Sequence, residues 1–163
     1  MEDEKGDITM KERYVRVGLV LLSLLYFQSA HAMTLCNPAE EIIWSCSSKN
    51  NIYSVCASKD LSINAGYMQY RAAKKGKTVF KYPEETKSHP STLFHFALLA
   101  KGAMLSFNNN EYKYELFEGL MGEPSIMVSK NGKTIQDIQC EAGSDTLTLT
   151  PIQKILAGAG IKE

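Results

Sequence analysis

The stretch Ile42–Ser58, IIWSCSSKNNIYSVCAS, consists of two short β-prone runs joined by a turn. Its outer parts, Ile42–Cys46 and Ile52–Ser58, are rich in β-branched and aromatic residues, which favour strands. The middle part, Ser47–Asn51, contains Ser and Asn, whose side chains bond their own backbone in turns, and Asn tolerates positive φ. The stretch therefore predicts an antiparallel hairpin.

The same alternation of apolar runs and turn residues continues down the chain. Further strands are expected at Tyr67–Ala73, Thr78–Tyr82, Leu93–Leu99, Ala103–Phe107, Tyr112–Phe117, Ser125–Ser129 and Thr134–Cys140. Asn131-Gly132 suits a type I′ turn between the last two. The pattern predicts a mainly β fold, an antiparallel meander of about eight or nine short strands in a small barrel or a sandwich.

The C-terminal segment has a different, helical pattern. Thr150 is a candidate N-cap, Pro151 fits the first helical position, and Gln153 completes a capping box. The apolar residues that follow at helical spacing are Ile152, Ile155, Leu156 and Ala159. Gly158 or Gly160 is expected to end this short helix.

The N-terminal segment, residues 1–32, has the layout of a cleavable signal peptide. A basic leader precedes the apolar run Gly18–Phe27, and Ala30 and Ala32 supply small residues before a cut. The run is too short to span about 30 Å of hydrocarbon as a helix. We therefore expect a single domain over residues 33–163, periplasmic or secreted, with no stable membrane anchor after cleavage.

Two details refine this expectation. The first nine residues are acidic where a leader should be basic, which suggests that translation starts at Met10. The first cysteine of the domain, Cys36, follows Leu35 rather than the small residue that a lipidation site needs. The exported product is therefore expected to be free of lipid.

All four cysteines, Cys36, Cys46, Cys56 and Cys140, follow the expected cleavage point. An even number of cysteines in an exported domain favours disulfides. Two pairings are plausible: Cys46–Cys56 with Cys36–Cys140, or Cys36–Cys56 with Cys46–Cys140. The spacing contains no CxxC motif, so we expect no metal.

The charge balance excludes one class of partner. The chain has 18 Lys and Arg residues and 18 Asp and Glu residues, whereas nucleic-acid binding needs a strongly basic face. A local basic cluster nevertheless spans one expected hairpin: Arg71, Lys74, Lys75, Lys77 and Lys81. Tyrosines, which are frequent in binding hot spots, lie beside it. The candidate binding residues are Tyr67, Tyr70, Arg71, Lys75 and Lys77.

Catalytic signals are weak. Two histidines, His89 and His95, follow the leader, and neither has a nucleophile elbow nearby. The neighbouring carboxylates Glu40-Glu41 and Glu84-Glu85 would point to opposite faces of a strand. We therefore predict no catalytic residue and no cofactor, with an enzyme that uses either histidine as a base as an alternative.

Three short motifs carry a resemblance to known proteins: Trp44-Ser45-Cys46, Tyr53–Ser58 and Tyr67–Arg71. Over roughly residues 36–140 the chain resembles a group of small exported proteobacterial proteins, which implies export and fold rather than an activity. Group members tend to follow the Tyr-Arg pair with Phe-Gly, where this chain has Ala72-Ala73. The chain is also faintly similar to the membrane-bound inhibitors of C-type lysozyme, although their inhibitory loop has no counterpart here.

These observations favour a binding module over an enzyme. The expected function is to occupy a protein partner, as an inhibitor of a cell-wall hydrolase or an immunity protein against a toxin does. The other alternative is an envelope-associated structural protein that uses the basic cluster on an anionic surface.

Overall fold

The computed structural model describes residues 33–144 and 146–162, which belong to one compact unit. The predicted signal peptide, with the suggested start at Met10, lies outside the described residues. Within the described ranges, no helix is both long enough and apolar enough to cross a membrane.

Within the described residues, ten strands form two antiparallel sheets, each with five strands. The first sheet has the order β10-β1-β2-β3-β4, with β1 (Glu40–Ser48), β2 (Asn51–Ser58), β3 (Met68–Lys74), β4 (Lys77–Tyr82) and β10 (Ala142–Ser144). The second runs in chain order through β5 (Phe94–Leu99), β6 (Gly102–Asn109), β7 (Tyr112–Gly119), β8 (Ser125–Lys130) and β9 (Lys133–Gln139). A 3-10 turn, η2 (Pro90–Thr92), precedes β5, and helix α2 (Thr150–Gly158) follows β10.

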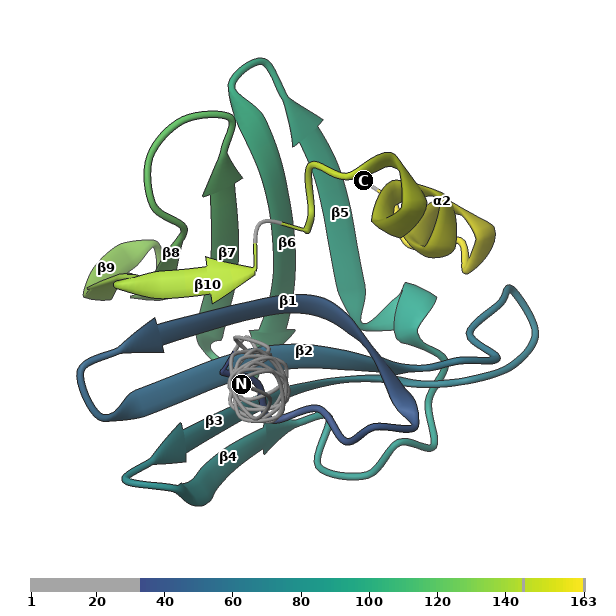
Figure 1. Cartoon of the computed structure of the whole chain (residues 1–163), viewed down its shortest axis with the longest axis horizontal. Coiled ribbons are helices and arrows are strands. Elements are labelled where there is room, and N and C mark those ends of the chain that lie inside the picture. The colour runs from purple at the N-terminus through teal and green to yellow at the C-terminus, as the bar shows by residue number, and fades with distance from the viewer. Residues whose placement is uncertain (1–32, 145, 163) are drawn as a thin grey trace, which may run out of the picture. The chain divides into compact units, whose positions relative to one another are not determined.

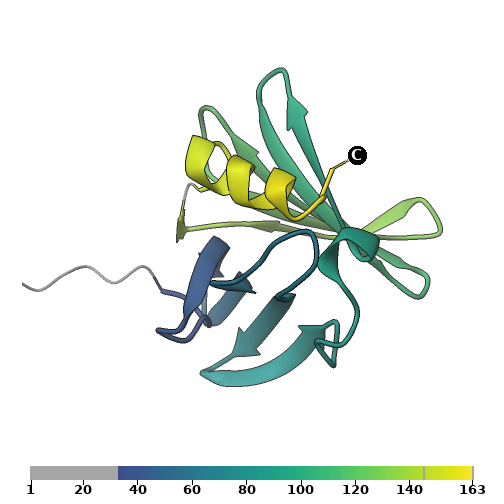
Figure 2. The same ribbon diagram turned by 90° about the vertical axis from the view of Figure 1, so that its right-hand side faces the viewer.

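The strands of one sheet cross those of the other steeply (Figure 1). No strand pairing joins the two sheets in the part of the chain that the structure describes, so the fold is sandwich-like rather than a closed barrel. Helix α2 lies beside the strands of the second sheet (Figure 2). The prediction of a mainly β meander with a short C-terminal helix is confirmed.

The hydrophobic core includes large aromatic side chains from both sheets. Trp44 of β1 and Phe107 of β6 are fully buried. The Phe107 ring stacks on Tyr82 with centroids 4.6 Å apart and on Tyr114 at 4.7 Å. The residues that β3 buries in this core are Met68, Tyr70 and Ala72, which share one face of the strand because side chains alternate between faces.

Two tight turns have the backbone geometry that a type I′ hairpin requires. Asn131 and Gly132, between β8 and β9, have φ angles of 51° and 75°, which confirms the predicted turn. Lys75 and Gly76, between β3 and β4, have φ angles of 50° and 77°. Lys75 therefore lies at the tip of the β3–β4 hairpin.

The disulfides are Cys36–Cys56 and Cys46–Cys140, the second of the two predicted pairings. The alternative with Cys46–Cys56 is wrong because the register of the β1–β2 hairpin separates those residues. Cys46 lies opposite Tyr53, and Cys56 lies opposite Ile42. Cys46 and Cys56 each form a disulfide with a cysteine outside this hairpin instead.

The start of helix α2 differs from its prediction, whereas its end agrees. The N-cap is Leu149 and makes no side-chain capping bond, so the expected capping box from Thr150 is wrong. Gln153 instead donates from Nε2 to the carbonyl oxygen of Thr148 at 2.9 Å. At the other end Gly160 has a φ of 73°, and the Ile161 N–H donates to the Leu156 carbonyl, as in a Schellman motif.

A buried carboxylate, that of Glu118 at the end of β7, replaces the expected cap. Its two oxygens accept backbone N–H groups of Thr146, Leu147 and Thr148, and the Thr148 hydroxyl, at 2.8 to 3.1 Å. Four donors satisfy a carboxylate that is only 1% exposed. Glu118 thereby fixes the segment that leads into α2.

Candidate functional site: two hollows beside strand β4

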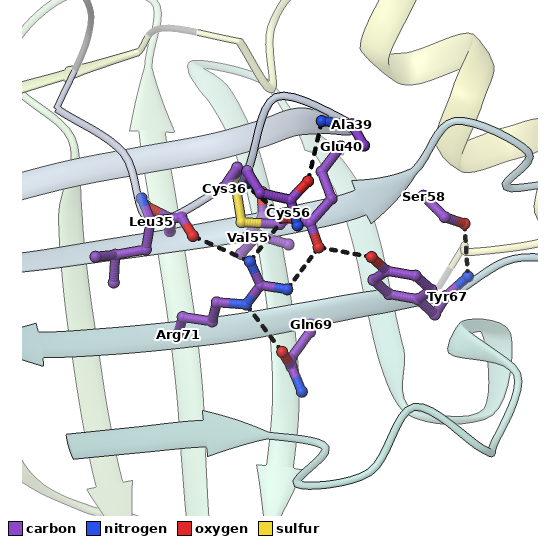
Figure 3. Close-up of polar contacts among 12 residues, drawn as sticks. Leu35, Cys36, Ala39, Glu40, Val55, Cys56, Ser58, Tyr67, Gln69 and Arg71 are labelled. Atoms are coloured by element: carbon purple, nitrogen blue, oxygen red, sulfur yellow. Dashed lines mark hydrogen bonds and ion pairs between the residues drawn. A yellow bond between two sulfur atoms is a disulfide. The ribbon is translucent and has the colours of Figure 1, made fainter. Parts of the chain in front are cut away.

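The outer face of the first sheet carries a network of polar side chains centred on Glu40 (Figure 3). The Arg71 guanidinium binds both carboxylate oxygens of Glu40, at 2.5 and 2.7 Å. The Tyr67 hydroxyl donates to the same carboxylate at 2.6 Å, and the Asn37 N–H donates to it at 2.8 Å. Tyr67 and Arg71, two of the five predicted binding residues, therefore lie side by side and share Glu40 as a partner, which the sequence indicated only as one of two neighbouring carboxylates.

This environment sets the protonation of Glu40. Burial by itself raises the pKa of the carboxyl group, but hydrogen bonds from Arg71, Tyr67 and Asn37 outweigh burial and lower it to about 2. The pKa of Tyr67 is raised, chiefly because its hydroxyl bonds to the Glu40 carboxylate. Glu40 and Arg71 thus form a charged pair whose side chains are only 1% and 14% exposed.

The segment before β1 closes over this pair. Arg71 donates to the Leu35 carbonyl oxygen at 3.0 Å, and the Leu35 N–H donates to the Ser54 hydroxyl at 2.9 Å. The Cys36–Cys56 disulfide holds the same segment against β2. Atoms of Cys36, Cys56 and Glu40 lie within 4.8 Å of one another, but metal coordination needs thiolates, and both sulfurs are in the disulfide.

A hollow of about 430 Å³ opens beside the network. It is lined by Tyr67, Gln69, Arg71, Glu84, Glu85, Thr86 and Lys87. Gln69 fixes the loop that begins at Pro83 and forms one wall of this hollow. Its side-chain NH₂ donates to the Pro83 carbonyl oxygen at 2.8 Å, and its side-chain oxygen accepts from Arg71 Nε at 2.8 Å. The Arg71 charge is therefore used within the protein and supports this wall instead of facing an outside anion.

A second hollow, of about 950 Å³, runs along β4. Its lining residues are Thr78, Val79, Phe80, Lys81, Tyr82, Pro83, Glu84, Asn109 and Asn110. Strand β4 is an edge of its sheet, and in the described part of the chain it pairs only with β3. The register shifts at Ala72/Ala73, where Phe80 and Thr78 are the partners on β4, so Val79 is the extra residue of a β-bulge. Val79 is 64% exposed.

The remaining predicted binding residues have different positions. Tyr70 is 2% exposed and its ring contacts Phe107 and Tyr114, so it belongs to the core and offers no surface to a partner. Lys75 and Lys77 are exposed at the β3–β4 hairpin. The binding roles of Tyr67, Arg71, Lys75 and Lys77 stay predictions.

The contribution of the second sheet to this site was not predicted from the sequence. Asn109 and Asn110 come from the β6–β7 turn, about thirty positions after β4. No local pattern links a turn to a distant strand, because strand spacing encodes faces and not partners. Val79 had a signal, since strand alternation places it on the same face as Lys77 and Lys81 and opposite Phe80.

Neither histidine lies in the two hollows. His89 caps η2, with Nδ1 2.8 Å from the Ser91 hydroxyl and Nε2 2.8 Å from the Ser62 carbonyl oxygen. Both ring nitrogens are therefore engaged in holding the local chain. His95 is exposed on β5 between the buried Phe94 and Phe96, as the strand alternation predicts.

The low pKa of Glu40 predicts an acid-sensitive stability. The carboxyl group titrates near 4.5 when unfolded and near 2 when folded, so the unfolded chain takes up the proton first as the pH falls. The contribution is complete above about pH 4.5 and is lost between there and about pH 2, with a total of about 3 kcal/mol. Denaturant unfolding at a series of pH values from neutral to acid measures it.

A matched pair of variants isolates Glu40 in that experiment. Glu40→Gln should flatten the stability profile in this acid range, because the titrating group is gone. Glu41→Gln, at the exposed neighbouring position, should leave the profile like that of the wild type. Parallel profiles for the wild type and Glu40→Gln would contradict the assignment.

Comparison with protein-family models, curated proteins and solved structures finds no match to this chain. The class of protein is therefore defined by the fold and the site alone. It is a disulfide-braced antiparallel β-sandwich with a hollow along an open edge strand.

Proposed function

We propose that this chain is an exported binding protein that acts by occupying a protein partner, in the manner of an inhibitor or an immunity protein. The observation that carries the proposal is the hollow of about 950 Å³ along β4, a concave surface beside an edge strand with an exposed apolar side chain. The two disulfides indicate an oxidising compartment outside the cytoplasm, and the periplasm or secretion fits the leader.

The chemistry of the hollow supports binding. Its lining offers amide groups from Asn109 and Asn110, the Thr78 hydroxyl, and the opposite charges of Lys81 and Glu84. These groups orient a ligand by hydrogen bonds and charge, while Val79 and Tyr82 add apolar contact. Neither histidine nor cysteine is among the lining residues. The lining therefore suits the binding of a ligand better than catalysis.

The surroundings of the hollow also support a preformed surface. Tyr82 stacks on the buried Phe107 at 4.6 Å, and Gln69 fixes the chain at Pro83. The Glu40–Arg71 pair anchors the neighbouring strand β3. A rigid surface loses little conformational entropy on binding, which favours affinity in a small protein.

A site-specific cross-linking experiment tests the proposal. A photo-reactive residue at Val79 in the full chain, exported in the source organism, should capture one partner protein. The matched control is the same residue at Ile135 on β9, which is 54% exposed against 64% for Val79 and lies outside the lining of the hollow.

Two results together would support the function. The protein captured at position 79 and not at 135, once purified, should bind the chain at micromolar concentration or tighter and lose its enzymatic or toxic activity. Equal capture at both positions, no capture at 79, or an unaffected activity of the captured protein would each count against it.

A further inference from the structure

We propose that β4 captures its partner by β-strand addition: an extended acidic segment of the partner pairs with β4 and becomes the sixth strand of the first sheet. This inference rests on the proposed function and specifies its mode and the chemistry of the partner. It is carried by three features of β4, namely its open edge, its uncompensated lysines and the hollow along it.

The open edge supplies backbone groups for pairing. Every second residue of an edge strand directs its N–H and C=O groups away from its only neighbour. Among the sheet edges, β5 runs beside α2, and residues of both line one hollow, while β10 is only three residues long. Strands β4 and β9 are therefore the edges best placed to accept a further strand.

The charges distinguish β4 from β9. The exposed lysines at β4 and its hairpin are Lys74, Lys75, Lys77 and Lys81. Among the described residues, none of the four makes an ion pair. Strand β9 carries both Lys133 and Asp137, so its edge does not favour a partner segment of either charge. A segment that pairs with β4 and compensates these lysines must be acidic.

The same lysines explain how an open edge stays selective. Pairing of β4 with β4 of a second copy would bring lysines together, and like charges on adjacent strands are unfavourable. An acidic strand would instead be attracted to the lysines of β4. The same lysines therefore disfavour self-association and favour an acidic partner. Glu84 lies at the far end of the hollow, which directs the acidic residues of the partner toward the Lys77 end.

The hollow along β4 can hold side chains of the added strand. Alternate side chains of an added strand point to opposite faces, and one set would enter the space between β4 and the Asn109–Asn110 turn. Val79 and Tyr82 line that space and suit apolar residues placed between the acidic ones. A concave edge of this kind fits an extended peptide better than a flat lipid surface.

A peptide-display selection with the full, oxidised chain tests the inference. Random linear peptides are selected for binding, and the enriched sequences are expected to be acidic, with apolar residues at alternate positions. N-methylation of one of the two alternating sets of backbone amides in an enriched peptide should abolish its binding, because those amides form the ladder hydrogen bonds with β4, whereas methylation of the other set should leave binding intact. Slower hydrogen exchange on peptide binding should appear at β4 amides and not at β9 amides.

Matched charge reversals locate the site. Lys77→Glu/Lys81→Glu should weaken the enriched peptide at least about tenfold, whereas Lys133→Glu on the other open edge should change the affinity little. Circular dichroism and thermal unfolding confirm that each variant is folded. The N-methylated peptide tests the pairing on the wild-type chain, so the result does not depend on a variant.

Several outcomes would overturn the inference: enrichment of neutral or basic peptides, binding unaffected by N-methylation of either alternating set of amides, protection at β9, or stronger binding to vesicles of anionic phospholipid than to any peptide. The proposed function has a separate readout. A partner that is captured at Val79 and inhibited, but that acidic peptides do not displace, would leave the function standing and remove strand addition.

Discussion

Replacing both Cys46 and Cys140 with alanine is expected to lower the free energy of unfolding by about 4 to 5 kcal/mol, because the disulfide closes a long loop in the unfolded chain. The two residues are 94 positions apart in sequence. Cys46 belongs to β1 of the first sheet, and Cys140 directly follows β9 of the second. Cys140 also precedes β10 of the first sheet, so this bond fixes the connection between the two sheets to β1. Denaturant unfolding under oxidising conditions measures its contribution.

The other disulfide is the internal control for this prediction. Cys36 and Cys56 are 20 positions apart, so Cys36→Ala/Cys56→Ala is expected to cost only about 3 kcal/mol in the same loop-closure model. Backbone contacts around Cys140 persist without its sulfur, since the Glu141 N–H donates to the Ser47 carbonyl at 2.8 Å. Equal losses for the two variants, or the reverse order, would show that loop length does not govern the effect.

Breaking the Glu40–Arg71 pair is expected to have the next largest effect. Glu40→Leu removes the counter-charge of Arg71, whose side chain is only 14% exposed, and such a loss typically costs about 3 to 5 kcal/mol. Arg71→Met should destabilise the chain similarly, because the Glu40 carboxylate keeps only its bonds from Tyr67 and Asn37. Denaturant unfolding at neutral pH measures both.

The double variant Glu40→Leu/Arg71→Met completes the cycle. An apolar pair of similar volume avoids both the buried charge and its desolvation, so most of the lost stability should return. Reversal of the sign at the exposed pair Lys113–Glu115, by exchanging the two residues, should change stability little. Additive losses in the double variant would mean that the two residues stabilise the fold independently and that the pair is not a unit.

Local patterns predicted most of the secondary structure. The strand expected at Tyr67–Ala73 is confirmed as β3, which places Met68, Tyr70 and Ala72 in the core, and Asn131-Gly132 forms the expected turn. Strand β10 was not predicted, because Ala142–Ser144 has no β-branched or aromatic residue. It forms because the Cys46–Cys140 disulfide and pairing with Ser45, Cys46 and Ser47 of β1 hold it there.

The errors share one cause, which is a contact between residues far apart in the sequence. Thr150 was expected to cap α2, but the Glu118 carboxylate bonds the backbone of residues 146–148 from 28 to 30 positions away. Tyr70 was expected on a binding surface, whereas the facing sheet covers its ring with Phe107 and Tyr114. The register of β1 against β2, and not cysteine spacing, excluded Cys46–Cys56.

The sequence by itself determined the strand pattern, the turn positions, the presence of two disulfides and the lysine cluster of the β3–β4 hairpin, because period-two alternation, turn chemistry and cysteine parity are properties of neighbouring residues. Only the tertiary structure decided which cysteines pair, that Arg71 belongs to Glu40, and that β4 is an open edge beside the Asn109–Asn110 turn. Those features depend on how two sheets stack and on which strand ends a sheet. Short-range patterns specify the faces of a strand but leave its distant neighbours open.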